Sequence, residues 1–264
     1  MPTIAIQNQP IPTGNIAVIQ NFFSTAIDLL FRHSPSHPAR NSQIRVHFGK
    51  NGPVTSYGGN NVTGWDIHLT AENDDWCKHV YQFAHEMCHV LAQFQQYQHC
   101  NQWFEESVCE AASLYVLRII SEMGANGKGP CVGFFGGGMP FHQAMKNYVD
   151  GLLEEPNRQA TTAEVKKGFK CNEAQLRIDP YWEKRKFSNV VANKLFPFFV
   201  AAPENWTAIE FLNTIPCSIT CNSFGDYLAN WKRAVAKEHR PFIKMIERML
   251  LRSKLCRIVA SCIG

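Results

Sequence analysis

The chain has 264 residues, 45% of them hydrophobic, and a formal net charge of +4 at pH 7. This length and composition suit one folded domain or two closely joined lobes. They exclude a low-complexity chain, and the charge is too small to indicate nucleic-acid binding. We also expect no membrane association, because no apolar run has transmembrane length and residues 1–13 lack the basic start and apolar centre of a signal peptide.

Two segments in the N-terminal part alternate apolar and polar residues, as strands with one buried face do. They are residues 44–48 (Ile-Arg-Val-His-Phe) and residues 65–70 (Trp-Asp-Ile-His-Leu-Thr). The Gly- and Asn-rich stretch between them, residues 49–64, predicts turns and room for one more short strand. We interpret His47 and His68 as exposed strand residues, not as metal ligands.

The most informative segment is the His-Glu-x-x-His motif at residues 85–89, within an apolar run whose spacing predicts a helix. On a helix, His85 and His89 lie one turn apart on one face, so both imidazoles can reach one metal ion. Glu86 lies about 100° away around the helix and is placed to act on a metal-bound water. Zinc suits two imidazoles and a carboxylate. The alternative is a helix with two structural histidines and a surface glutamate.

A second helix is predicted from Asn101, a suitable N-cap, to Ile120. Within it, Glu106 and Glu110 are spaced i,i+4 and project from one face. We favour Glu106 as the third zinc ligand, with Glu105, Glu110 and a distant residue as alternatives. Glu110 would then accept the free N–H of a ligating histidine. We interpret Glu105 as a solvated carboxylate in the first helical turn.

These two segments resemble the gluzincin metallopeptidases, the clan of thermolysin and aminopeptidase N, over about residues 44–125. In that clan a helix carrying Trp-x-x-Glu or Asn-Glu follows the His-Glu-x-x-His helix, and Trp103 matches its tryptophan. The resemblance implies Zn²⁺ as cofactor and Glu86 as general base. It implies the zinc ligands His85, His89 and Glu106, with Glu110 orienting a histidine.

The chain departs from the clan pattern beside the third ligand. Glu105 replaces the usual Asn, and Ser107 replaces the common Gly. No Gly-x-Met-x-Asn motif precedes the zinc helix. The resemblance therefore does not extend to recognition of a peptide N-terminus.

The resemblance also implies where substrate and oxyanion donor lie. In zincins the strand before the metal helix forms the edge of a small sheet and pairs with substrate backbone, so a peptide or protein substrate is expected to dock along residues 65–70. Tyr181 is the candidate oxyanion donor, in an Asp-Pro-Tyr-Trp-Glu-Lys segment similar to the Pro-Tyr-Glu-Lys stretch of some aminopeptidase relatives. Its alternatives are Tyr227, His142 and Tyr148.

After residue 120 the pattern is mostly helical. Helices are predicted over residues 141–153, 182–200 and 223–255, the last interrupted at Pro241. Thr161-x-x-Glu164 has the form of a capping box for a further short helix. The Gly-rich residues 124–138 lack the Gly-Lys-Ser/Thr ending of a phosphate loop, which argues against nucleotide binding.

The chain contains ten cysteines. Cys77, Cys88 and Cys109 fall among apolar helix positions and are predicted to be buried thiols, whereas the pairs Cys217/Cys221 and Cys256/Cys262 could be bridged in an oxidising compartment. We interpret Cys88, between the two histidines, as packing on the core side, because a thiolate on the metal would displace the catalytic water. We expect a cytoplasmic protein.

The sequence thus predicts an α+β, zincin-like catalytic domain over residues 1–264. A small sheet lobe with the zinc helices occupies about residues 1–125, and a mainly helical lobe occupies residues 126–264. The predicted function is zinc-dependent peptide-bond hydrolysis with Glu86 as general base. A catalytically silent zincin that binds metal or peptide, and a zinc hydrolase of other substrates, are the alternatives.

Overall fold

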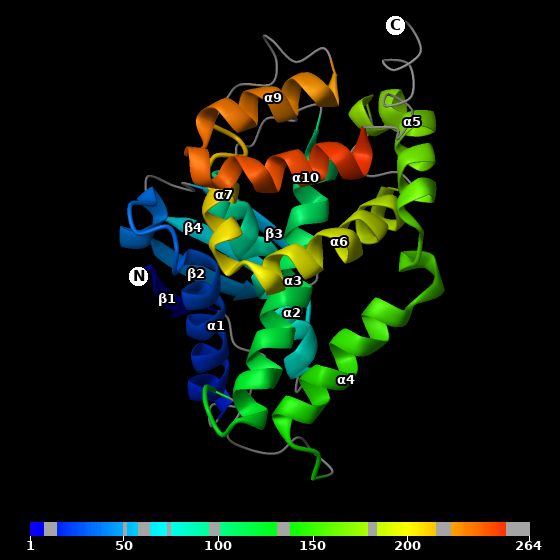
Figure 1. Ribbon diagram of the computed structural model, residues 1–264. Helices are drawn as coiled ribbons and strands as arrows, with labels where there is room; N and C mark the ends of the chain where they lie inside the picture. Colours follow the sequence, from blue (N-terminus) through cyan, green and yellow to red (C-terminus); the bar gives the residue numbers. More distant parts are fainter. Residues whose placement is uncertain are drawn as a thin grey trace, which may run out of the picture.

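The computed structural model describes residues 1–7, 15–49, 52–57, 64–72, 75–94, 101–130, 138–178, 184–214 and 223–251. The fold is α+β, with a small sheet beside a larger helical part (Figure 1). The strands are β1 (Thr3–Ile6), β2 (Gln43–Phe48), β3 (Val54–Tyr57) and β4 (Trp65–Leu69). The main helices are α1 (Ile16–Phe31), α2 (Trp76–Leu91), α3 (Gln102–Ala125), α4 (Phe141–Glu154), α5 (Thr162–Ile178), α6 (Lys184–Ala201), α7 (Trp206–Ile209), α9 (Phe224–Ala234) and α10 (Arg240–Leu250).

The sheet is mixed, with strand order β1-β2-β4-β3. Strands β1, β2 and β4 run parallel, and β3 pairs antiparallel with β4. The expectation that residues 65–70 form the sheet edge is therefore wrong. The Gly- and Asn-rich stretch supplies β3, which folds back on β4, so β4 is paired on both sides and cannot accept a further strand. The sheet edge that contacts α2 is β3.

The two faces of the sheet differ in polarity. Ile44, Val46 and Ile67 are fully buried on the face covered by helices, whereas the other face carries a polar cluster. There Arg45 donates two hydrogen bonds to Asp66, at 2.8 and 2.5 Å, which lower the pKa of Asp66 to about 2. His47 bonds Asp66 at 2.8 Å and stacks on His68. Both histidines thus lie on the outer face of their strands, where they are half-buried and not exposed as interpreted from the sequence.

Helix α3 is the central element of the helical part and packs against α2, α4 and α6 (Figure 1). Its residues are buried on nearly all sides from Gln102 to Leu117, which is typical of a helix surrounded by other helices. Asn101 is its N-cap residue, as predicted, and the Asn101 carbonyl accepts the Phe104 N–H at 2.9 Å. One continuous apolar core extends from α1 to α10 through α3.

The later helices follow the predicted signals. Thr161 and Glu164 form the capping box of α5: the Thr161 N–H donates to the Glu164 carboxylate at 2.6 Å, and the Glu164 N–H donates to Thr161 Oγ1 at 3.2 Å. Ser223 caps α9. The predicted helix over residues 223–255 is divided into α9 and α10, and Pro241 lies in the first turn of α10.

The C-terminal end of helix α2, which carries the His-Glu-x-x-His motif, is held by its neighbours. The Ala39 N–H donates to His37 Nδ1 at 3.1 Å, so His37 Nε2 carries the proton and donates to the Leu91 carbonyl at 3.0 Å. Burial lowers the pKa of His37 to about 4 and keeps the ring neutral. Gln93, with φ at 55°, turns the chain after α2 and donates to the Glu210 carbonyl at 3.0 Å. These contacts fix the helix turn that carries His89.

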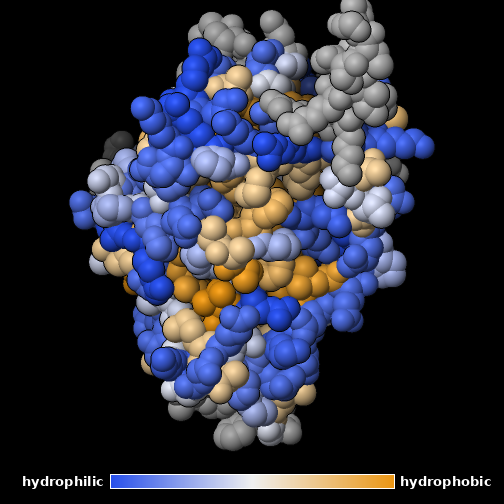
Figure 2. All heavy atoms as spheres, in the orientation of Figure 1, coloured by the Kyte–Doolittle hydropathy of each residue, from blue (hydrophilic) through white to orange (hydrophobic). Residues whose placement is uncertain are grey.

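The surface in view is mostly polar, with apolar side chains gathered in a band where α6 crosses α3 (Figure 2). Across the described ranges, none of the helices combines the length and the apolar character needed to cross a membrane.

Candidate metal centre

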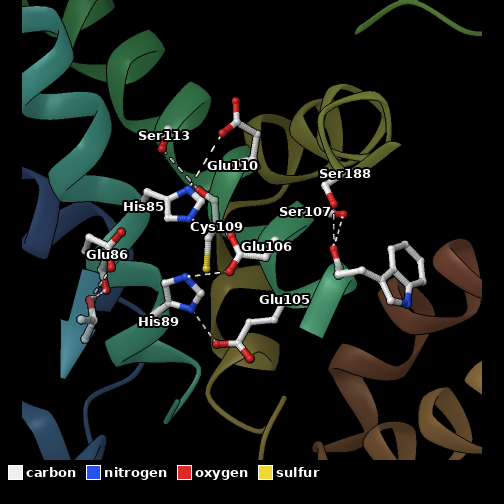
Figure 3. A network of polar contacts seen from close by, with 12 residues as sticks. His85, Glu86, His89, Glu105, Glu106, Ser107, Cys109, Glu110, Ser113 and Ser188 are labelled. Atoms are coloured by element: carbon white, nitrogen blue, oxygen red, sulfur yellow. Dashed lines mark hydrogen bonds and ion pairs between the residues drawn. The ribbon is translucent and has the colours of Figure 1, made fainter. Parts of the chain in front are cut away.

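Helices α2 and α3 lie side by side and direct the predicted metal-binding residues toward one another (Figure 3). His85 and His89 project from the same face of α2, and their ring centroids are 5.2 Å apart. Glu106 faces them from α3. Its Oε2 lies 3.2 Å from His85 Nε2, and its Oε1 lies 3.7 Å from His89 Nε2. The structure thus brings the three predicted zinc ligands together.

The spacing of these atoms suits a small tetrahedral cation. With bonds near 2.0–2.1 Å, nitrogen and oxygen ligands of tetrahedral zinc are separated by about 3.4 Å. The two carboxylate oxygens of Glu106 lie near that separation, one from each imidazole, at 3.2 Å from His85 and 3.7 Å from His89, and the shorter contact is also a hydrogen bond. The site is also open, because the side chains of His85 and Glu106 are 18% and 27% exposed. A catalytic zinc needs such an opening.

Cys109 belongs to the same centre, although the sequence interpretation gave it no role there. A nitrogen of His85, a nitrogen of His89 and Cys109 Sγ all lie within 4.8 Å of one another. The sulfur lies beside both imidazoles and the Glu106 carboxylate (Figure 3). A signal existed: Cys109 follows Glu106 by three residues and shares its helix face.

Glu105 has a different environment from the predicted one. The interpretation of Glu105 as a solvated carboxylate is wrong, because the side chain is fully buried. Its Oε1 lies 2.7 Å from His89 Nδ1, and its Oε2 accepts a hydrogen bond of 2.8 Å from Asn213. Because the carboxylate holds Nδ1–H, Nε2 of His89 is left to face Glu106 and the metal position. Asn213, in the segment after α7, therefore contacts the first turn of α3.

Glu110 lies on the other side of the centre, next to His85. Its Oε2 is 3.9 Å from His85 Nδ1, a distance for an ion pair but too long for a hydrogen bond. The Glu110 carboxylate accepts hydrogen bonds from the Tyr81 hydroxyl and from Arg158, and Arg158 is buried whereas Tyr81 is half-buried. Tyr81 precedes His85 by four residues on α2, so helical spacing predicts that the two lie on one face. Arg158 follows Glu110 by 48 residues, and no local pattern predicts their contact.

Glu86 turns toward the sheet edge. The Thr55 hydroxyl of β3 donates to Glu86 Oε2 at 2.6 Å, and Glu86 is only 3% exposed. Thr55 was not identified from the sequence, because nothing in a turn-rich stretch specifies which residue meets a helix 31 positions later. The contact holds the predicted general base against the edge strand β3.

The charges of the centre favour a cation. Glu86, Glu105, Glu106 and Glu110 surround two imidazoles. Burial alone would lower the pKa values of His85 and His89, but the carboxylates outweigh burial and raise both, that of His89 to about 10. Burial likewise opposes ionisation of Glu106, yet the two imidazoles lower its pKa to about 2. Positive charge is thus strongly stabilised here, by protons or by a metal that competes with them.

The remaining predicted residues have the following positions. Tyr181 lies outside the described residues. Of its alternatives, Tyr148 packs on Tyr81, Tyr227 donates to the Leu212 carbonyl at 3.3 Å, and His142 lies on α4.

Cys77, Cys88 and Cys109 are buried as predicted. The Cys88 thiol contacts Cys109, and within the described chain Cys88 is not one of the donors that converge with the histidines.

Comparisons of this chain with known protein families, with curated proteins and with solved structures found no match. The chemistry of the centre therefore has to be argued from its own residues.

Replacing Glu105 with glutamine is expected to weaken metal binding. The amide can still accept the His89 N–H but carries no charge to raise the basicity of the ring, and loss of such partners costs about 10- to 100-fold in metal affinity. Competition titration of zinc against a chelating dye measures the effect. Glu122→Gln, at an exposed position of the same helix, is the matched control. Equal affinities for the Glu105 variant and wild type would show that Glu105 serves packing alone.

Proposed function

We propose that this protein is a zinc-dependent peptidase with a gluzincin-like centre. The observation that carries the proposal is the approach of the Glu106 carboxylate to both histidines, with Oε2 3.2 Å from His85 and Oε1 3.7 Å from His89, at a site where the His85 and Glu106 side chains are partly exposed. The surrounding carboxylates supply the negative charge that a divalent cation needs. Imidazole and carboxylate donors together suit zinc better than magnesium or calcium.

His85, His89 and Glu106 would hold the ion, and Glu105 would orient His89. Bound zinc would acidify a water molecule and polarise the scissile carbonyl. Glu86 would accept the proton of that water and pass it to the leaving amine. The hydrogen bond from Thr55 steadies the Glu86 carboxylate while leaving its other oxygen for this proton. Glu110, held by Tyr81 and Arg158, would support His85 electrostatically.

A peptide substrate would dock along the edge of β3. This strand adjoins β4 on one side, and Thr55 connects it to Glu86. Its residues Val54 and Tyr57 are 48% and 53% exposed. Backbone pairing of an extended peptide with β3 would bring a peptide bond toward the metal position. This is the substrate class that we infer, with no role for nucleic acid or for a membrane.

The cellular location belongs to the same proposal. Cys88, Cys109 and Cys171 are free thiols, the state that cytoplasmic reductants maintain. We therefore retain the cytoplasm as the expected compartment.

The experiment is the cleavage of a mixed peptide library by the full chain, read by mass spectrometry as new termini. Zinc-loaded protein is expected to cleave, chelated protein to be inactive, and added zinc to restore cleavage. Bound zinc without cleavage of any peptide would reject the peptidase and favour the catalytically silent zincin. Failure to bind zinc at all would reject the metal centre itself.

A further inference from the structure

We propose that the Cys109 thiolate is a fourth protein ligand of the metal, beside His85, His89 and Glu106, and that it restrains turnover in the resting protein. This inference rests on the proposed zinc centre and concerns its regulation. It starts from the convergence of Cys109 Sγ with one nitrogen of each histidine within 4.8 Å.

The sulfur is close enough to bind without rearrangement of the backbone. With Zn–S near 2.3 Å and Zn–N near 2.0–2.1 Å, a tetrahedral site separates sulfur from nitrogen by about 3.6 Å. The observed limit of 4.8 Å exceeds this by little more than 1 Å. Changes in the side-chain torsions of Cys109 and His85 would close such a difference, with the His89 ring still bonded to Glu105.

The position of Cys109 on α3 keeps its sulfur at the centre. Glu106 and Cys109 are spaced i,i+3, so both project from one helix face. Cys109 is fully buried, whereas the Glu106 side chain is 27% exposed. The thiol therefore approaches from the protein interior and the carboxylate from the solvent side. The Cys88 thiol of α2 contacts it.

A fourth ligand changes what the centre can do. Zinc sites with four protein ligands are closed and structural, whereas catalytic sites keep one position for water. With Cys109 bound, that position is occupied, so wild type would turn over only in the fraction of molecules from which the sulfur has withdrawn, which slows cleavage without abolishing it. A thiolate also selects zinc or cobalt over magnesium and calcium.

The test is the absorption spectrum of the full chain loaded with Co²⁺, under a reductant that contains no thiol. A near-ultraviolet band from sulfur-to-cobalt charge transfer is expected in wild type and in the control Cys88→Ser, and is expected to be lost in Cys109→Ser. That variant should still bind about one metal ion through the three remaining ligands, and its zinc form should cleave peptides faster than wild type.

X-ray absorption of the wild-type zinc form gives a second readout that needs no variant, with one sulfur neighbour expected. Metal bound without the band and without a sulfur neighbour would overturn the Cys109 inference and leave the peptidase proposal intact. A wild type that binds no metal would overturn both. If Cys109 proved to be a ligand but Cys109→Ser cleaved peptides no faster than wild type, the inference that Cys109 restrains turnover would be wrong.

Discussion

Replacement of Glu86 by glutamine is expected to abolish peptide hydrolysis while zinc remains bound. Glutamine keeps the shape of the side chain and can still accept the hydrogen bond from Thr55. It cannot accept a proton from water, and loss of a general base costs about 100- to 10,000-fold in rate. Glu86 is not among the groups that approach His85 and His89 within ligand distance, so the metal should be unaffected.

The measurement combines kcat on a cleaved library peptide with elemental analysis of the same preparation. Thr55→Val is the informative comparison, because it removes the hydroxyl donor but keeps the carboxylate. A smaller loss of kcat is expected for Thr55→Val than for Glu86→Gln. Full activity of the glutamine variant would show that Glu86 has only a structural role.

Replacement of His85 by alanine is expected to remove stoichiometric zinc. His85 contributes one of the two imidazoles and lies 3.2 Å from Glu106, so its loss leaves an incomplete set of donors. Because a bound ion stabilises the folded state by mass action, a chelator should lower the melting temperature of wild type and leave that of His85→Ala unchanged.

The matched control is His68→Ala, on the outer face of the sheet and stacked on His47. Elemental analysis of protein purified without added zinc should give about one zinc per chain in wild type and in the control. If His85→Ala retained as much zinc as wild type, the assignment of the centre to α2 and α3 would be wrong.

Local patterns in the chain predicted the elements and the pair of helices that meet at the centre. Helical spacing alone placed His85 beside His89, and the same rule placed Glu106 and Glu110 on one face of the next helix. Capping signals at Thr161 and Ser223 identified helix starts because a cap is a contact between residues three positions apart. Such contacts depend on the local chain and on nothing more distant.

The surroundings of each acidic residue at the centre depend on contacts with residues far away in the sequence. The sequence predicted a solvated Glu105 because no neighbour on its own helix signals burial. Its observed partner, Asn213, lies 108 residues later in the chain and donates a hydrogen bond to the carboxylate. The Glu110 carboxylate is bound by Arg158. The predicted sheet edge was β4 and the observed edge is β3, because strand order depends on how the turn-rich segment between β2 and β4 folds back.

The sequence by itself determined an α+β chain with two adjacent helices that carry the candidate metal donors, since periodicity and capping are properties of neighbouring residues. Only the tertiary structure decided that Cys109 joins the donors, that Glu105 holds His89, and that Thr55 of the edge strand binds Glu86. Burial, donor convergence and strand order result from packing between segments far apart in the chain, and no local pattern encodes those distances.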